Sequence, residues 1–322
     1  MIPDGPYDAD IVILSLERTE ETIAAIASAC AQTGVSCHVF VLDQGSCSAS
    51  LARLTAAIAG MAKVSLLVSD SNLGVAGGRN LISNLGHGRA IVGLDSDAEF
   101  ADPLTVARMV AALDAEPRLG AIGCRIVRYA DGQDDLSSWG YPAALAASAG
   151  MCFDSVTYVG AGHAIRREAW RQAGGYDPRL FFCWEEYDFC LRAIARGWQI
   201  RYRGDIVVRH KVSPGQRVGW GGDRWFYHVR NRLYIERKLG RTWLSLAPRI
   251  AGYLLKGMRN GLSGPTMRGV RAALSMVPDT VRGLPVAGRT YCLRNDNAHR
   301  GGVRRRLMQD VFSRIAAEPA RR

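Results

Sequence analysis

Residues 90–97 read A-I-V-G-L-D-S-D, a stretch in which an apolar run is followed by two acids. Its first five residues have the length and character of a buried β-strand, and two acids, Asp95 and Asp97, follow where the strand ends. In open α/β sheets, ligands bind beyond the carboxyl ends of the strands. The stretch therefore predicts a strand of such a sheet and a polar site at its edge.

Similar apolar runs of strand length occur on both sides of this stretch. They cover residues 10–16, 36–42, 64–68 and 120–127, with predicted helices between them. Strands that alternate with helices indicate βαβ units and a mostly parallel sheet. The continuous apolar character agrees, because helices cover a parallel sheet on both faces. We therefore expect an α/β fold with a mostly parallel sheet and flanking helices.

The pattern is less regular in the second part of the chain. Residues 130–155 are rich in Gly, Asp and Ser, which predicts a loop insertion. Residues 185–197 predict a helix, and two short strands are expected over residues 198–203 and 205–210. Beyond these strands the pattern turns helical and basic.

The net charge of the 322 residues is +11, and it is distributed unevenly. Residues 240–322 hold 16 Lys and Arg against four acids, a net charge of +12, so residues 1–239 are close to neutral. We expect one large α/β domain over residues 1–239 and a basic, mostly helical extension over residues 240–322. Such asymmetry indicates an anionic partner: nucleic acid, a phosphorylated substrate or an acidic membrane surface.

The cysteines and the hydropathy indicate a location. None of the eight cysteines lies in a C-x-x-C or zinc-binding spacing, and most lie in apolar runs, as expected in a reducing compartment. The first ten residues lack the pattern of a signal peptide, and no run of 18 apolar residues predicts a transmembrane helix. The predicted location is the cytoplasm.

The paired acids after residues 90–94 suit a divalent cation. Asp95 and Asp97 are separated by one small residue, so both can reach the same ion. Mg²⁺ and Mn²⁺ take oxygen ligands, and such ions often keep the oxygens of a diphosphate as further ligands. Because D-x-D is a common pattern, a turn with solvated acids is the alternative.

Two further stretches suit a phosphorylated ligand. Asp43 ends a predicted strand in V-L-D-Q-G-S, where a carboxylate can accept hydrogen bonds from a base or from ribose hydroxyls; an Asx-turn or a helix cap is the alternative. Residues 72–80, N-L-G-V-A-G-G-R-N, combine glycines that allow close backbone approach with Arg79, which can pair with phosphate. A plain turn before a helix is the alternative there.

Residues 184–192, W-E-E-Y-D-F-C-L-R, place three acids among aromatic and apolar side chains. Carboxylates are rarely buried unless they are paired or bind a metal. On a helix, Glu185 and Asp188 share a face with Arg192, so both acids can form ion pairs with Arg192, or with Arg179 or Arg196 nearby. Glu186 has no obvious local partner and is the candidate functional acid.

His210 closes the last predicted strand in V-V-R-H. Its neighbours Arg209 and Lys211 are expected to lower its pKa and keep the imidazole neutral, which is the form that binds a metal. A solvated histidine at a strand end is the alternative.

Taken in order, these stretches resemble the family 2 glycosyltransferases, the inverting nucleotide-sugar enzymes of GT-A fold. The likeness is greatest to the bacterial branch that includes rhamnosyl- and galactofuranosyltransferases, and it covers about residues 9–238. The matching stretches are S-L-E-R after the first strand, V-L-D-Q-G-S, N-L-G-V-A-G-G-R-N, L-D-S-D-A, V-G-A-G-H-A-I-R-R-E-A-W-R-Q-A-G-G-Y-D, F-F-C-W-E-E-Y-D-F-C-L-R-A and R-H. R-N-R-L, residues 230–233, also recurs in this branch.

The resemblance implies a Rossmann-like GT-A domain that uses a UDP or dTDP sugar, Mg²⁺ or Mn²⁺, and a glycan or lipid-linked glycan acceptor. It implies that one group of residues contacts the donor: Ser15, Glu17, Asp43, Arg79 and Asp95. Asp97 and His210 are the implied metal ligands, with Asp95 on the metal side of the donor.

The resemblance also implies the roles of the acid pair Glu185–Glu186. Family members usually carry Glu-Asp or Asp-Asp there, and the second acid is the general base. Glu186 is therefore the expected base, one methylene longer than the usual residue, and Glu185 lies beside it. The surrounding aromatic residues are then expected to form the floor of an acceptor pocket, where they stack on sugar rings.

Two other classes of function are considered. A nucleotidyltransferase that acts on sugar phosphates would show a glycine-rich, basic loop straight after the first strand, and residues 15–18 read S-L-E-R instead. A nucleic-acid-binding protein would account for the basic extension, but this extension has few aromatic residues suited to base stacking. The amphipathic stretch 243–258 is expected to pack on the core, or else to lie at an anionic membrane surface.

Overall fold

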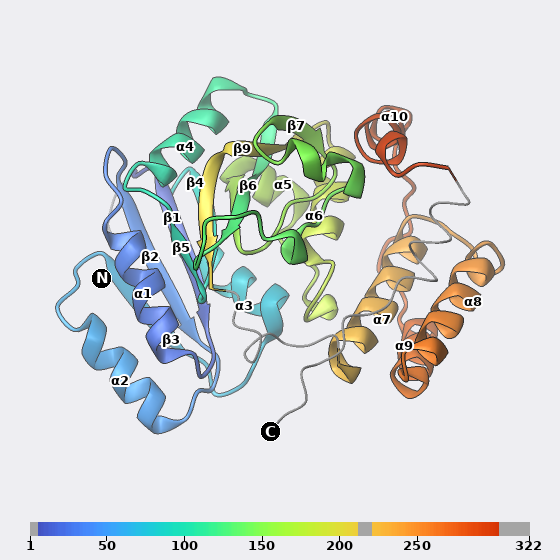
Figure 1. The fold of residues 1–322 in the computed structure, drawn as a ribbon, viewed down its shortest axis with the longest axis horizontal. Coiled ribbons are helices and arrows are strands. Elements are labelled where there is room, and N and C mark those ends of the chain that lie inside the picture. The colour runs from blue at the N-terminus through green and yellow to red at the C-terminus, as the bar shows by residue number, and fades with distance from the viewer. Residues whose placement is uncertain (1–5, 212–220, 303–322) are drawn as a thin grey trace.

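The computed structural model describes residues 6–211 and 221–302 (Figure 1). A central sheet carries helices on both faces, and a further group of helices, α7 to α10, lies beside this body. The strands are β1 (Ala9–Ser15), β2 (Cys37–Asp43), β3 (Val64–Val68), β4 (Ala90–Asp95), β5 (Ala98–Phe100), β6 (Leu119–Arg128), β7 (Cys152–Ser155), β8 (Gly162–Arg166) and β9 (Gln199–His210).

The sheet has the order β3-β2-β1-β4-β8-β6-β9-β5, and β7 pairs with β9. Strands β1, β2, β3, β4, β6 and β9 run in one direction, while β5, β7 and β8 run in the opposite direction. The predicted α/β fold with a mostly parallel sheet is therefore confirmed.

Helices bury both faces of the sheet, as the continuous apolar strands predicted. The helices of this body are α1 (Thr19–Cys30), α2 (Ser48–Ile58), α3 (Gly74–Ser83), α4 (Thr105–Ala115), α5 (Arg167–Ala173) and α6 (Glu185–Ile194). Along β1, Ile11 and Ile13 pack in the cluster formed with α1, α2 and α4, whereas Val12 packs in the cluster formed with α3, α5 and α6. The alternation of side chains along a strand thus supplies two cores.

Two predictions of secondary structure were wrong. Residues 152–155, at the end of the expected loop insertion, form strand β7 and pair with β9. Residues 199–210 form the single strand β9 rather than two short strands. The G-D pair at Gly204 and Asp205 lies beside a shift of register between β6 and β9, so it marks a bulge and not a turn. A Cβ atom at Gly204 would lie 2.5 Å from the backbone of residues 149–151, which explains why a glycine fits there.

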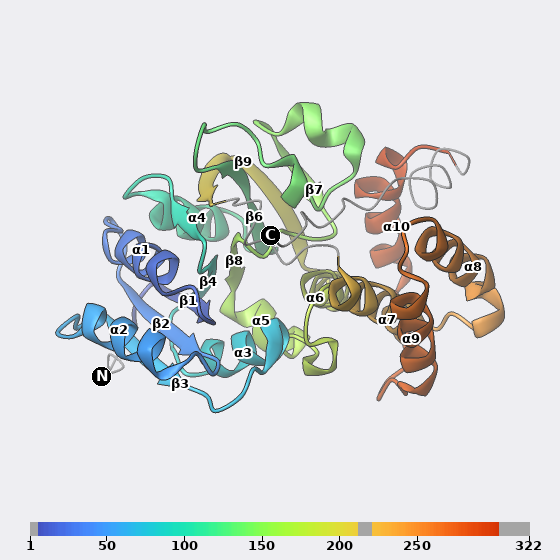
Figure 2. The ribbon, with the colours of Figure 1, turned by 60° about the horizontal axis from the view of Figure 1, so that its bottom comes forward.

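The C-terminal helices form a layer of their own. They are α7 (Gly222–Lys238), α8 (Trp243–Arg259), α9 (Ser263–Ser275) and α10 (Val286–Asn295). Figure 2 shows them stacked beside α6. Trp225 and Val229 of α7 pack with Leu246 of α8 and Val270 of α9. The helical extension is thus present, although residues 303–322 of the predicted range lie outside the described residues. None of the described helices is both long enough and apolar enough to cross a bilayer.

Candidate active site

Three of the predicted residues end neighbouring strands at one edge of the sheet. Ser15 of β1 is in register with Asp43 of β2, and Leu14, one residue earlier, is in register with Asp95 of β4. The chain order changes direction between β1 and β4, which is the position where open α/β sheets bind ligands. Ser15, Asp43 and Asp95 therefore lie together at the carboxyl ends of the strands, as expected from the sequence.

Asp43 is buried and already bonded by its own loop. Its Oδ1 accepts hydrogen bonds from the backbone N–H of Ser46 at 3.0 Å and of Gly45 at 3.3 Å, and its Oδ2 accepts one from the Ser46 hydroxyl at 2.5 Å. This is the Asx-turn that the sequence left open as the alternative. Contact between Asp43 and a base stays a prediction.

The loop after β1 is joined to the start of α2 through Glu17. The residue has a left-handed backbone, φ 61°, and its carboxylate accepts hydrogen bonds from the Cys47 N–H at 2.5 Å and the Ser50 hydroxyl at 2.9 Å. These bonds lower the pKa of Glu17. Ser15, just before it, is buried with its hydroxyl 3.3 Å from that of Thr22. Donor contact by either residue stays a prediction.

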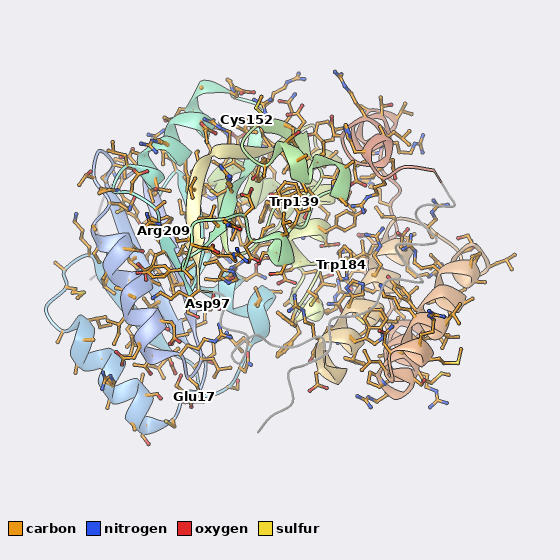
Figure 3. All side chains as sticks on the ribbon, viewed as in Figure 1. Glu17, Asp97, Trp139, Cys152, Trp184 and Arg209 are labelled. Carbon is orange, nitrogen blue, oxygen red and sulfur yellow. The ribbon has the colours of Figure 1, made fainter. Side chains whose placement is uncertain are left out.

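Asp97 and His210 lie side by side, although 113 positions separate them in the sequence. His210 Nε2 is 3.4 Å from Asp97 Oδ1, because β5 and β9 pair next to both residues. On its other side, His210 Nδ1 is 3.0 Å from Asp135 Oδ2. Arg18 forms an ion pair with the second oxygen of Asp97. Figure 3 labels Asp97 below the centre of the sheet body.

The expected direction of the His210 pKa was wrong. Burial lowers this pKa, but the hydrogen bonds to Asp135 and Asp97 outweigh burial and raise it to about 9. The Lys211 ammonium, which was expected to lower the pKa, pairs instead with Glu99 at 2.5 Å. Alternation along β9 places the two neighbours of His210 on the opposite face of the strand.

The donor set fits a divalent cation whose coordination the substrate completes, provided that the ion displaces the proton that the raised pKa places on His210 at neutral pH. In the described ranges, no group of three or more His, Cys, Asp or Glu side chains is arranged to hold a metal ion. Mg²⁺, however, is usually held by one or two protein ligands together with substrate phosphates and water. An imidazole that binds a metal commonly donates its other ring N–H to a carboxylate, and Asp135 has this position toward His210.

Arg79 joins the strand edge to the acid pair. Its guanidinium donates to Asp95 Oδ1 at 2.6 Å, to the Gly160 carbonyl at 2.8 Å and to Glu186 Oε1 at 3.4 Å. The side chain is 3% exposed, so a contact with diphosphate, which the sequence led us to expect, stays a prediction. A Cβ atom at Gly160 would lie 2.4 Å from Glu186 Oε1, so only glycine leaves room for this arrangement.

The two acids at the start of α6 have different surroundings. Glu186 faces Arg79, whereas Glu185 is 3% exposed and its Oε2 has no hydrogen-bond partner among the described residues. Burial raises the pKa of Glu186, and Arg79 opposes this rise. Burial, followed by the charge of Glu186, raises the pKa of Glu185 well above its ordinary value.

The ion pairs predicted for this helix form at one acid and not at the other. Asp188 pairs with Arg192 at 2.8 Å and with Lys238 of α7 at 2.6 Å. The predicted pairing of Glu185 with Arg192 was wrong, because the Arg192 guanidinium bonds Asp188 and the carbonyls of Ala173 and Gly175. Among the three acids of α6, an ion pair within the helix therefore explains the burial of Asp188 only.

Two residues at this site, Asp135 and Arg18, could not be identified from the sequence. Asp135 lies in D-L-S-S and bonds both following serines, a pattern that indicates a turn and not a partner for a histidine 75 positions away. Arg18 ends the S-L-E-R stretch, and its pairing with Asp97 depends on the loop after β1 turning toward β5.

Comparison with known proteins shows the family to which the chain is similar. The family model described as "Glycosyl transferase family 2" matches residues 10–173. The succinoglycan biosynthesis protein ExoO of Rhizobium meliloti (strain 1021) is 37% identical over 112 residues, which are 35% of this chain and 31% of that protein. The chain thus aligns with about a third of the length of this relative.

Two solved structures show a similar fold at low sequence identity. The mannosyltransferase PcManGT from Pyrobaculum calidifontis, in complex with GDP-Man and Mn²⁺, has a TM-score of 0.58 and 15% identity, covering 97% of this chain and 86% of that one. Residues 1–349 of TarS from S. aureus, in complex with UDP-GlcNAc, have a TM-score of 0.53 and 11% identity, covering 71% of this chain and 66% of that one.

Proposed function

The chain belongs to glycosyl transferase family 2, and we propose that it transfers a sugar from a nucleoside diphosphate donor to a hydroxyl group of an acceptor, with inversion at the anomeric carbon. The observation that carries this proposal is the position of Arg79 between Asp95 and Glu186. The Arg79 guanidinium contacts both Asp95, at the end of β4, and Glu186, a buried acid that can serve as a base. It thereby connects the edge of the sheet where the donor is expected to bind with the group that would accept the proton.

Glu186 is the general base of the proposed reaction. Its carboxylate accepts the proton of the acceptor hydroxyl while that oxygen attacks the anomeric carbon. The bond between this carbon and the diphosphate oxygen breaks, and the electron pair leaves with the nucleoside diphosphate. The raised pKa of Glu186 makes it a stronger base than an ordinary carboxylate. No covalent bond to the protein is required.

The donor lies across the ends of β1, β2 and β4 in this proposal. Ser15 and Glu17 line the nucleotide pocket, and Asp43 supports the loop next to the base of a UDP or dTDP sugar. The Asx-turn of Asp43 orders this loop before a ligand binds. Similar proteins carry GDP-Man or UDP-GlcNAc in their structures, which supports a nucleoside diphosphate sugar as the class of donor.

Asp97 and His210 would hold a divalent cation, Mg²⁺ or Mn²⁺, with Asp95 on the donor side. Their facing atoms are 3.4 Å apart, which suits two ligands of one small ion. The bound cation would offset the negative charge that develops on the departing diphosphate. Asp135 would orient the His210 ring through its bond to Nδ1.

A panel of nucleotide sugars tests the proposed donor class. Each sugar nucleotide is added with Mn²⁺, and the midpoint of thermal unfolding and the release of free nucleotide are measured. At 100 times its Kd, a ligand should stabilise the protein by about 2.7 kcal/mol. A donor that does so only with the metal supports the proposal. A rise of the midpoint that is the same after exhaustive chelation argues against the proposed metal site.

The outer face of α8 supports a lipid-linked acceptor. Leu246 packs toward α7 and α9, whereas Leu244, Leu255 and Met258 are 86%, 38% and 61% exposed. These apolar side chains accompany the excess of basic residues in the C-terminal part, a combination suited to anionic headgroups. We propose that this part of the chain contacts the cytoplasmic face of a membrane, where a glycan acceptor on a lipid would be presented.

Sedimentation with lipid vesicles tests the membrane contact. The full chain should bind vesicles that contain anionic lipid, and salt should release it, because the contact depends on charge. Replacing Leu244 and Met258 with Ser should weaken this binding without loss of stability. Equal binding to neutral and anionic vesicles, or no binding to either, would contradict the proposal.

A further inference from the structure

The residues before the acid pair form a strained loop. Phe181, Cys183 and Trp184 all have left-handed backbones, with φ values of 60°, 70° and 74°. The Phe182 N–H donates to the Leu180 carbonyl at 2.6 Å, which closes a γ-turn centred on Phe181. Residues with side chains adopt such conformations only where the surroundings enforce them, at a cost of about 1–3 kcal/mol each.

This loop determines the position of both sides of the site. Trp184 directly precedes α6, and its carbonyl accepts the first helical hydrogen bond, from the Asp188 N–H at 2.9 Å. The carbonyl of Phe181 accepts from the first turn of α3, at 2.7 Å from the Val75 N–H and 3.3 Å from that of Ala76. The loop therefore joins the helix that carries Glu186 to the helix that carries Arg79.

The side chain of Asn231, on α7, binds the loop along its length. Asn231 is fully buried, and its amide nitrogen is 2.8 Å from the carbonyl oxygens of Leu180, Phe182 and Cys183. Its amide oxygen accepts from Arg230 Nε at 2.8 Å, which assigns the nitrogen to the side of the loop.

Two neighbours of Asn231 support the same loop. The Arg230 guanidinium donates to the carbonyls of Arg179 and Leu180, each at 2.8 Å. The Arg232 guanidinium lies 5.0 Å from the centre of the Trp184 ring, and the Trp184 indole N–H donates to the His228 carbonyl at 3.2 Å. Figure 3 shows Trp184 between the sheet body and the C-terminal helices.

We propose that Asn231 is a positioning residue, which holds the loop of residues 180–184, with its three left-handed residues, in place and thereby fixes the distance between Arg79 and Glu186. The role of the amide follows from its two N–H donors facing three carbonyl oxygens. An aspartate would place negative charge against the same oxygens and has no hydrogen to donate at neutral pH. The effect of Asn231 on the reaction rate rests on the proposed function, whereas its effect on the loop rests on the geometry alone.

Amide hydrogen exchange in the full chain tests the loop without any substrate. Asn231→Asp should speed exchange in residues 180–188 and at Val75 and Ala76, because their acceptors lie in or depend on the loop. Asn260→Asp is the matched control, since the Asn260 amide donates to the Lys256 carbonyl at 2.8 Å at the end of α8, away from the loop. It should leave both segments unchanged.

Steady-state kinetics, with a donor identified by the panel, test the consequence. A misplacement of about 1 Å can cost about 10²-fold in rate, so kcat should fall by that order while the KM for the donor changes little. Should Asn231→Asp fail to fold, Arg230→Ala removes the two bonds from this guanidinium to the loop and its bond to the Asn231 amide oxygen, and it should show smaller changes in the same directions.

The two assays separate the possible failures. Exchange that stays at the wild-type rate, or kcat that stays unchanged while exchange rises, would overturn the role of Asn231. A wild-type chain without transfer from any donor would overturn the proposed function, and the exchange rates would still decide whether Asn231 holds the loop.

Discussion

Replacing Arg79 with Met should show how much the contacts of this guanidinium with Asp95 and Glu186 contribute to the free energy of unfolding. Methionine fills much of the same volume and removes the charge, so three acceptors lose their donor: Asp95, the Gly160 carbonyl and Glu186. The guanidinium is 3% exposed, the Glu186 side chain 15% and the Asp95 side chain 40%. Water can therefore replace the lost partner of Asp95 more readily than that of Glu186.

The expected loss of stability follows from this burial. Removing one partner of a buried ion pair typically costs about 3–5 kcal/mol, and the exposure of Asp95 favours the lower end, about 3 kcal/mol. Much of that cost is the buried Glu186 carboxylate left without a counter-charge. Glu186→Gln should consequently stabilise the Arg79→Met protein. The same substitution should have a less favourable effect on the stability of the wild-type protein, and the difference between the two effects, the coupling energy, should be about 1–2 kcal/mol.

Urea denaturation of the wild type, both single variants and the double variant measures this coupling. Arg108→Met is the control, because Arg108 and Asp102 pair at 2.8 Å at the surface, with side chains 49% and 38% exposed. Its loss should cost at most about 1 kcal/mol. Effects of Arg79→Met and Glu186→Gln that add within about 0.5 kcal/mol would refute the coupling.

Three further predictions concern the acids of the site. Glu185→Gln replaces a buried carboxylate, whose Oε2 has no partner among the described residues, with an uncharged amide, so the loss of the buried charge should stabilise the protein at neutral pH by about 1–3 kcal/mol. Because the folded state raises the pKa of Glu185, the wild-type protein loses stability as the pH rises and this carboxyl ionises. The stability gained by Glu185→Gln should therefore be smaller at pH 4 than at pH 8, and an equal gain at both pH values in thermal unfolding would contradict this. Asp97→Asn should weaken the dependence of donor binding on Mn²⁺, measured by calorimetry, and an unaltered dependence would argue against Asp97 as a ligand. The rate should fall in acid with a midpoint above the ordinary carboxyl pKa of about 4.3, because burial raises the pKa of Glu186, and a midpoint at or below that value would be inconsistent with Glu186 as the base.

The sheet and its polar edge were predictable because they depend on local pattern. The apolar runs that end at Asp43 and Asp95 predict strands, and the carboxyl ends of parallel strands meet at one edge. Strand β9 was divided in error because Gly204 reads as a turn in sequence, while its bulge depends on contact with residues 149–151.

The contacts between distant segments were not predictable in this way. Arg79 and Glu186 are 107 positions apart, and His210 and Asp135 are 75 positions apart, so no periodic pattern relates them. Glu185 lies on the helical face that suggested a pair with Arg192, but Asp188 and backbone carbonyls occupy that guanidinium. Spacing along a helix shows which side chains can meet, and packing decides which of them do.

The rate and the donor affinity of the Glu186→Gln protein show whether Glu186 is the general base. The substitution keeps the size of the side chain and removes the group that accepts the proton, so donor affinity should stay near the wild-type value while kcat falls by about 10²–10⁴. Glu185→Gln, one position earlier, is the matched control and should retain most of the wild-type rate. Wild-type turnover by Glu186→Gln, together with an inactive Glu185→Gln protein, would show that Glu185 and not Glu186 is the base.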